Sequence, residues 1–192
     1  MRDLDVRSAL RLQLRNEHAD DPNTLIIEEL GLCERTSRID LAVVNGSLHG
    51  YEIKSARDTL ERLPAQAAVY SRIFDTVTVV ADSGHLPQVR RIVPRWWGLT
   101  RARWLGGVVV LHAVRKARQN PSIDPFAVAQ LLWRDEALAE LEVRQRSFGV
   151  RTAKRELIWR RLADTTPLTE LGALVRQQLK IRQGWRVHAP QK

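Results

Sequence analysis

A hairpin signal in the N-terminal half constrains the fold of this chain more than any other stretch. Residues 37–44 and 48–54 are rich in Val, Ile, Leu and Tyr, and Asn45-Gly46 lies between them. This dipeptide between two strand-like runs predicts a β-hairpin. Opposed residues of an antiparallel pair have numbers with a constant sum, which is 91 for a two-residue turn here. We predict instead a sum of 92, from a three-residue turn with Gly46 in a left-handed bulge or from a β-bulge along the strand.

The positions of three charged side chains depend on this register. Alternation places Glu52 and Lys54 on one face of their strand and Tyr51 and Ile53 on the other. Asp40, on the neighbouring strand, shares the face of Glu52 only if the paired residue numbers sum to 92. Two adjacent carboxylates repel each other unless a cation bridges them, and Mg²⁺ binds such oxygens while it keeps several waters. Asp40 and Glu52 are therefore our predicted metal ligands, and Lys54 is predicted to position or deprotonate a metal-bound water.

Two alternatives stay open at this centre. For a further metal-binding acid we choose Glu28, because strand alternation lets only one of Glu28 and Glu29 face the centre, and Glu17 on the first helix is a rival. The plainer interpretation of the three charged side chains is a surface ion pair on a half-exposed sheet, worth at most about 1 kcal/mol.

The hydrophobic pattern predicts an α/β fold with the element order α-β-β-β-α-β. The elements are a helix over residues 3–16, strands over 24–30, 37–44 and 48–54, a helix over 55–74 and a strand over 75–81. Beyond them we expect a short helix over 85–94, an extra hairpin of strands over 95–104 and 106–116, a linker over 120–125, and helices over 126–142, 150–164 and 166–182, the last with Pro167 as its first residue. The composition shift near residues 121–125 predicts an α/β domain over 1–120 and a helical region over 121–192.

The spacing of the charged residues resembles the PD-(D/E)XK nuclease superfamily, which has the restriction-endonuclease-like fold. The stretch "RID" is followed by "EIK" after eleven residues, so that Asp40, Glu52 and Lys54 match the family's metal-binding and catalytic positions. The family's α-β-β-β-α-β core in a mixed sheet agrees with the predicted order. Ile39 replaces the proline that precedes the family's aspartate. The resemblance covers about residues 3–81.

A second motif is similar to the branch of this superfamily that contains RecB-type exonucleases. Gln66 and Tyr70 in "QAAVY" match its QxxxY motif and share one face of the predicted helix. The wider layout resembles a group of short, poorly characterised bacterial or phage proteins. The resemblance implies a DNA endo- or exonuclease that uses Mg²⁺ or Mn²⁺, in which Gln66 and Tyr70 orient the substrate strand. A homodimer is compatible with it.

The net charge of +9 is unevenly placed along the chain. Residues 1–111 carry 15 Lys+Arg against 14 Asp+Glu, whereas residues 112–192 carry 16 against 8. Such an excess is typical of a surface for a polyanion. We therefore expect DNA to bind the basic C-terminal helices, with Trp185 as the best candidate for stacking on a base. The alternatives are a non-catalytic nucleic-acid-binding protein that retains the nuclease fold, and an adaptor without DNA affinity.

The remaining composition predicts a cytoplasmic protein, and the resemblance described above implies a prokaryotic one. The longest apolar run, around residues 105–114, is far shorter than the roughly 20 residues that span a bilayer. Residues 1–10 carry acids where a signal peptide is basic and then apolar. Cys33 is the only cysteine, so an internal disulfide is excluded and a small buried side chain is expected.

Overall fold

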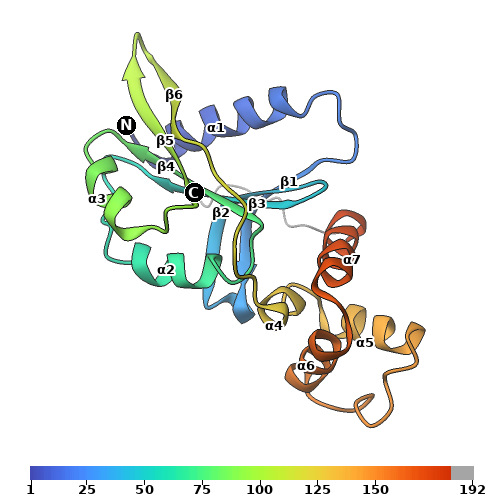
Figure 1. Ribbon diagram of the computed structural model, residues 1–192. Helices are drawn as coiled ribbons and strands as arrows, with labels where there is room; N and C mark the ends of the chain where they lie inside the picture. The colour runs from blue at the N-terminus through green and yellow to red at the C-terminus, as the bar shows by residue number, and fades with distance from the viewer. Residues whose placement is uncertain (183–192) are drawn as a thin grey trace, which may run out of the picture.

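A mixed six-stranded sheet organises the protein, and its strand order follows the chain from β1 to β6 (Figure 1). The computed structural model describes residues 1–182. The strands are β1 (Leu25–Leu32), β2 (Ser37–Val44), β3 (Leu48–Lys54), β4 (Thr76–Asp82), β5 (Gly98–Leu105) and β6 (Val108–Arg115). Strands β3, β4 and β5 are parallel to one another, and the other neighbours pair antiparallel. The α/β class and the mixed sheet are confirmed.

The sheet is covered on both faces. The helices are α1 (Asp3–Glu17), α2 (Leu63–Tyr70), α3 (Leu86–Ile92), α4 (Pro125–Ala129), α5 (Arg134–Val143), α6 (Arg155–Thr165) and α7 (Leu168–Ile181), and a short 3₁₀ turn spans Cys33–Arg35. On one face, Val6, Leu10 and Leu14 of α1 pack with Leu41 and Ile53. Helices α2 and α3 cover the other face, where the larger core also includes side chains of α4 to α7. Burying each such aliphatic side chain stabilises the fold by about 1.5–3 kcal/mol.

The β2–β3 hairpin has the predicted register, but its pairing begins at Leu41 and does not include Asp40 and Glu52. Leu41 pairs with Tyr51 and Val44 with Leu48, so the sum of paired numbers is 92 as predicted. The residues between the strands, 45–47, form a three-residue turn. Gly46 does not have a positive φ, so the predicted left-handed bulge is wrong. The Asn45 side chain supports the turn instead, because its Oδ1 accepts the backbone N–H of Ser47 at 3.0 Å.

Two predicted helices are shorter than the hydrophobic pattern suggests. The helix expected over 55–74 begins only at Leu63, because Pro64 lacks an N–H and is accommodated only in the first turn. The helix expected over 126–142 is divided into α4 and α5. The break follows from the extended backbone of Trp133, whose N–H is capped by Glu136 Oε2 at 2.7 Å. Pro167 precedes α7 instead of opening it.

The segment expected to be a linker is fastened to the sheet domain. Asn120 is 8% exposed, and its Nδ2 donates to the carbonyl oxygens of Ser71 and Phe74 at 2.8 and 2.9 Å. Asp124 caps α4 by accepting from Phe126 N at 2.9 Å. Because α4 to α7 also share the larger core, the helical region is packed onto the sheet domain within residues 1–182. No helix in this range is long and apolar enough to cross a bilayer. Trp185 lies outside the described residues.

Candidate active site

Glu52 and Lys54 form a buried ion pair on the α2 face of the sheet. Lys54 Nζ donates to Glu52 Oε1 at 2.7 Å, and the two side chains are 5% and 3% exposed. The exposed surface pair that the sequence also allows is therefore excluded. A buried ion pair stabilises a protein only when its remaining donors and acceptors have partners. The surroundings of this pair consequently determine what it does.

Helix α2 supplies those partners through the two residues of the QxxxY motif. Gln66 Oε1 accepts from Lys54 Nζ at 2.9 Å, and Gln66 Nε2 donates to Glu52 Oε1 at 2.7 Å. Tyr70 Oη lies 2.9 Å from Glu52 Oε2 and 2.6 Å from the carbonyl oxygen of Arg38. Tyr70 is 0% exposed, so in this structure it holds Glu52 from behind. Gln66 reaches the same carboxylate and also lines the cleft described below.

The hydrogen bonds of Tyr70 bear on the protonation of Glu52. A tyrosine hydroxyl has one proton, and the Arg38 carbonyl oxygen can only accept. Both contacts of Tyr70 Oη are satisfied together when Glu52 Oε2 carries a proton. Burial raises the pKa of Glu52 from its ordinary value, in agreement with this arrangement, although Lys54 opposes the shift. Burial and the charge of Glu52 also raise the pKa of Tyr70, which keeps its hydroxyl protonated.

Asp40 lies where β2 departs from regular strand geometry. The pairing of β2 with β3 begins only at Leu41, and the pairing with β1 omits Asp40 and Glu29. Glu29 has a φ of 56°, which is unfavourable for a residue with a side chain. Ile39 packs in the α2-side core whereas Leu41 packs under α1, so the predicted strict alternation fails between them. This irregularity frees Asp40 from the ladder.

The carboxylate of Asp40 is held by α1 and by the backbone of β3. Arg7 Nη2 donates to Asp40 Oδ1 at 2.7 Å, and Ile53 N donates to Oδ2 at 2.7 Å. Burial, and then the charge of Glu52, raise the pKa of Asp40 to about 7, while Arg7 opposes the shift. Asp40 and Glu52 thus take their partners from opposite layers of the fold, yet the charge of Glu52 acts on Asp40 and both residues line the same cleft.

The structure places Glu29, not Glu28, beside Asp40. Glu29 Oε1 lies 2.7 Å from Arg7 Nη1, so Glu29 and Asp40 share one guanidinium. Glu28 pairs with Arg11 at 3.2 Å and is 39% exposed. Because the left-handed backbone at Glu29 breaks the alternation, both glutamates reach arginines of α1. Among residues 1–182 no group of three His, Cys, Asp or Glu side chains is arranged to hold a metal ion, so the predicted set of Asp40, Glu52 and Glu28 is not assembled.

Arg7 is the residue of this centre that the sequence analysis missed. It follows Val6 on α1, and its guanidinium donates to both the side chain and the carbonyl oxygen of Asp40. The sequence contains a pattern that could have identified it, because Arg7 and Arg11 are one helical turn apart and flank the apolar stripe of the helix. A helix that packs on acid-bearing strands places such arginines against carboxylates.

A cleft of about 1260 Å³ runs from this centre toward the helical region. Acids dominate its sheet end, whereas arginines of α5 and α6 and the end of α7 line its far side. Arg155 of α6 spans the cleft to an ion pair with Glu34. The charged lining consists of seven acids (Asp3, Glu28, Glu29, Glu34, Asp40, Glu52 and Asp58) and six bases (Arg38, Lys54, Arg62, Arg134, Arg155 and Arg182).

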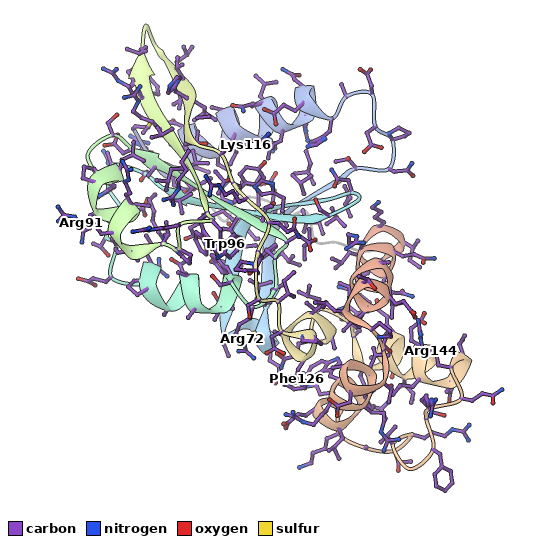
Figure 2. The ribbon with its side chains drawn as sticks, in the orientation of Figure 1. Arg72, Arg91, Trp96, Lys116, Phe126 and Arg144 are labelled. Atoms are coloured by element: carbon purple, nitrogen blue, oxygen red, sulfur yellow. The ribbon has the colours of Figure 1, made fainter. Side chains whose placement is uncertain are left out.

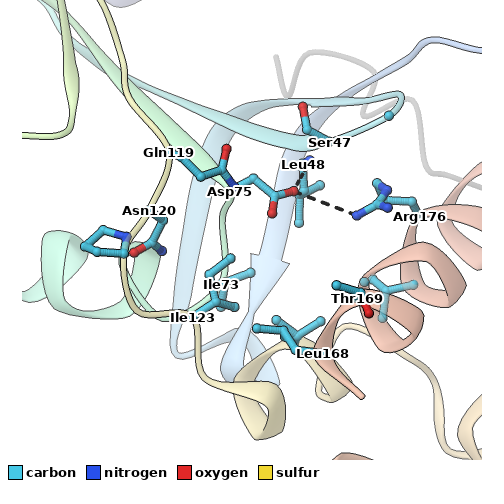
Figure 3. Close-up of a pocket in the computed structure, with 15 residues that line it drawn as sticks. Ser47, Leu48, Ile73, Asp75, Gln119, Asn120, Ile123, Leu168, Thr169 and Arg176 are labelled. Atoms are coloured by element: carbon cyan, nitrogen blue, oxygen red, sulfur yellow. Dashed lines mark hydrogen bonds and ion pairs between the residues drawn. The ribbon is translucent and has the colours of Figure 1, made fainter. Parts of the chain in front are cut away.

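A second, smaller cavity of about 460 Å³ lies between the β2–β3 turn, the 119–123 segment and α7 (Figure 3). Asp75 Oδ2 accepts from Leu48 N at 2.7 Å there and is 3.8 Å from Arg176 Nη1. None of the predicted site residues lines this cavity. It belongs to the junction of the sheet with the helical region.

Comparison with known proteins shows the family to which the chain belongs. The family model described as Bacteriophage P4 protein cII matches residues 5–186. Protein cII of Enterobacteria phage P4 is 30% identical over 111 residues, which is 58% of this chain and 42% of that relative, so the chain spans less than half of the relative's length. The solved SPO1766 protein of unknown function from Silicibacter pomeroyi is similar over 72% of this chain and 90% of its own, with 18% identity and a TM-score of 0.41. By the match over nearly its whole length, the chain belongs to the bacteriophage P4 protein cII family.

Proposed function

We propose that this protein is a metal-dependent nuclease with a restriction-endonuclease-like fold that hydrolyses phosphodiester bonds of DNA. The observation that carries the proposal is the buried Glu52–Lys54 pair, fixed by Gln66 and Tyr70 and open to a large cleft beside Asp40. A buried ion pair with no catalytic task is often replaceable by apolar residues. A centre that must hold a carboxylate and an ammonium at one place has a reason to retain it.

The donor chemistry of the centre fits a hard divalent cation. A carboxylate has about four lone-pair sites; each Asp40 oxygen accepts one protein hydrogen bond, and Glu52 Oε1 accepts two. Asp40 and Glu52 thus retain acceptor capacity for a cation that needs one or two carboxylates and completes its shell with water and phosphate. Such a cation, when bound, neutralises developing charge on the phosphate and acidifies a bound water.

In this proposal Lys54 acts on the reacting groups. Its ammonium has three N–H donors, of which Glu52 and Gln66 receive two. The third is available for a water or a phosphate oxygen in the cleft. Glu52 and Gln66 therefore orient Lys54, and Tyr70 fixes Glu52 in turn. Arg7 fixes Asp40 from the opposite face.

Cleavage assays test the proposal directly. Purified protein is incubated with supercoiled, linear and single-stranded DNA in Mg²⁺, Mn²⁺ or EDTA, and products are separated on gels. We expect cleavage that requires the metal and is lost in Lys54→Ala. Lys154→Ala is the matched control, because Lys154 is an exposed lysine at the start of α6. Equal cleavage by Lys54→Ala and the parent would contradict the assignment.

A second candidate is a nucleic-acid-binding protein that retains the fold without cutting. The observation that favours it is that each carboxylate of the centre already has a cationic partner within the protein. Arg7 pairs with Asp40, and Lys54 pairs with Glu52. Calorimetry separates the two candidates. The nuclease binds Mn²⁺, and Asp40→Asn abolishes the binding, whereas the second candidate shows no metal-binding heat in either protein.

A further inference from the structure

The most basic part of the described chain is not the helical region but the segment from α3 to the end of β6 and just beyond. Residues 83–123 contain eight Lys+Arg and no Asp or Glu. Six of the eight side chains are exposed, and Arg101 and Arg115 are partly buried. We call these eight residues the α3–β6 surface: Arg90, Arg91, Arg95, Arg101, Arg103, Arg115, Lys116 and Arg118.

The cations of the helical region are mostly neutralised by neighbours. Residues 124–182 carry eleven Lys+Arg against eight Asp+Glu. Seven of these eleven cations form ion pairs, at Arg134, Arg144, Arg151, Arg155, Arg160, Arg176 and Arg182. In contrast, no ion pair joins the α3–β6 surface to any acid within residues 1–182. The free positive charge is therefore concentrated on α3, β5 and β6.

The fold holds these like charges close together. Arg115 Nε and Nη2 donate to the carbonyl oxygens of Trp97 and Pro94 at 2.7 and 3.1 Å, so Arg115 is fixed in place. Burial, and then the charges of Arg90 and Arg118, lower the pKa of Arg115. Arg91 points outward from α3 (Figure 2). Adjacent cations that repel one another lower the stability of the fold, and a bound polyanion removes that repulsion.

The surface also approaches the candidate active site along the sheet. Lys54 pairs with Ala81 of β4, and Ala81 pairs with Arg101 of β5, so Arg101 stands two strands from Lys54, roughly 10 Å away. Leu99 packs in the α2-side core, so by alternation Arg101 and Arg103 project from the face that carries Lys54. Arg101 Nε is buried and has no hydrogen-bond partner among the described residues. A phosphate oxygen would satisfy that donor.

The shape of the surface favours duplex DNA over a compact acidic partner. The β5–β6 hairpin extends beyond the rest of the sheet as a two-stranded ribbon (Figure 1). The major groove of B-DNA admits such a ribbon. The eight residues of β6 span about 26 Å, or about eight base pairs. Val108 and Val110 on the face of Arg103 are 59% and 42% exposed, as contact with base methyl groups requires.

We propose that the α3–β6 surface binds the phosphate backbone of duplex DNA. The β5–β6 hairpin would lie along a groove of the duplex, and one DNA strand would lead toward Lys54. The inference rests on the proposed function for the identity of the substrate. This location differs from the expectation that the basic C-terminal helices bind DNA. Seven of the eight cations are arginines, which bind phosphate through two parallel hydrogen bonds.

Fluorescence anisotropy with a labelled duplex in EDTA, over a series of salt concentrations, tests this surface without any cleavage. The variant is the triple substitution Arg90→Gln, Arg91→Gln and Arg118→Gln. Each phosphate contact contributes about 0.9 to the slope of log K against log salt, so the slope should fall by about 2.7 and the affinity at 0.1 M salt by roughly a few hundredfold. The matched control removes the same charge from ion-paired arginines of the helical region, by Arg144→Gln, Arg151→Gln and Arg160→Gln.

The control triple should keep most of the slope and affinity. A fall of the slope by less than half the expected value, or an equal fall in the control, overturns the proposal. Displacement of the duplex by poly-glutamate at equal charge concentration also overturns it, because the surface would then select acidic proteins. Urea unfolding of the first triple should show unchanged or higher stability, since Arg115 loses two like-charged neighbours. Lower stability would assign those arginines a structural role and overturn the proposal.

These results are separable from a failure of the proposed function. Binding in EDTA does not depend on a metal or on catalysis. A parent protein that binds DNA through the α3–β6 surface but never cuts refutes the nuclease and leaves this inference standing. A parent that cuts DNA, with a triple variant that binds like the parent, refutes this inference and leaves the nuclease standing.

Discussion

Replacing Lys54 by methionine tests whether the Glu52–Lys54 pair is the buried, coupled unit on which the candidate site depends. The ion pair has an N–O distance of 2.7 Å, and both side chains are at most 5% exposed. Removing one partner of such a pair leaves an uncompensated buried charge and costs about 3–5 kcal/mol. For a chain of this size each kcal/mol lowers the melting temperature by about 2–4 °C. We therefore expect Lys54→Met to melt roughly 6–20 °C below the parent.

The stability lost in Lys54→Met should depend on pH, because the substitution changes the pKa of Glu52. Burial already raises the pKa of Glu52 above its ordinary value of 4.5, and loss of the Lys54 charge raises it further. In this variant the folded protein holds a proton that the unfolded chain releases above about pH 4.5. The destabilisation is consequently small below pH 4.5 and grows as the pH rises through neutrality.

Urea unfolding, followed by tryptophan fluorescence at several pH values, measures these effects. The full cycle adds Glu52→Gln and the double variant Glu52→Gln/Lys54→Met. The double variant should be more stable than the sum of the single changes predicts, with a coupling of about 2 kcal/mol or more. Lys154→Met, at an exposed position, is the control and should change stability by less than about 0.5 kcal/mol. A loss below about 1 kcal/mol in Lys54→Met that does not vary with pH would refute the reasoning, because an exposed ion pair behaves in that way.

Three other predictions follow from the same centre and its neighbours. If Asp40, with a pKa raised to about 7 by burial and the charge of Glu52, binds the metal, calorimetric affinity for Mn²⁺ should rise up to about tenfold per pH unit below pH 7 and level off above it; an affinity independent of pH would exclude Asp40 as a ligand. Tyr70→Phe removes the hydroxyl bound to Glu52 and to the Arg38 carbonyl oxygen, and should cost about 1–3 kcal/mol by urea unfolding; a neutral outcome would show that these contacts do not hold Glu52. Burial lowers the pKa of His49 to about 4, so stability should be lost as the pH falls from 6.5 through 4, and His49→Gln should flatten this dependence; an NMR titration of His49 near its ordinary pKa of 6.5 would contradict it.

Local sequence rules predicted the β2–β3 hairpin but not the kink beside it. Alternation and the chemistry of two acids were enough to select the three-residue register, because a one-residue slip turns every side chain of a strand to the other face. The positive φ at Glu29 has no local signal, since glutamate rarely adopts it and no glycine marks the site. The kink arises from contacts that are distant in sequence, chiefly Arg7 of α1 holding both Glu29 and Asp40. Such contacts are visible only once helix and sheet are packed.

The charge distribution shows a similar limit in predicting where unpaired positive charge lies. Counting residues 112–192 as one basic block gave the excess of positive charge but did not show which of its cations are ion-paired in the fold. The block joins the acid-free end of the α3–β6 surface to helices whose arginines are paired with glutamates and aspartates. Formal charge is a property of composition, whereas the charge available to a ligand depends on ion pairs made in the fold. A scan for the longest stretch without acids would have found residues 83–123.

The two candidate functions differ in what occupies the space between Asp40 and Glu52 at neutral pH. Arg7 and Lys54 each pair with one of these carboxylates, while burial raises the pKa of both and the charge of Glu52 also raises that of Asp40. Burial thus favours a proton on this pair of carboxylates in the resting centre. A divalent cation would compete with that proton and leave the Arg7 and Lys54 contacts in place, since the carboxylates retain free lone pairs. A non-catalytic protein would keep the proton at every metal concentration. The same structure is therefore compatible with a nuclease whose metal affinity depends on pH and with a binding protein that ignores the metal, and the pH dependence of metal binding distinguishes them more sharply than the presence of the motif.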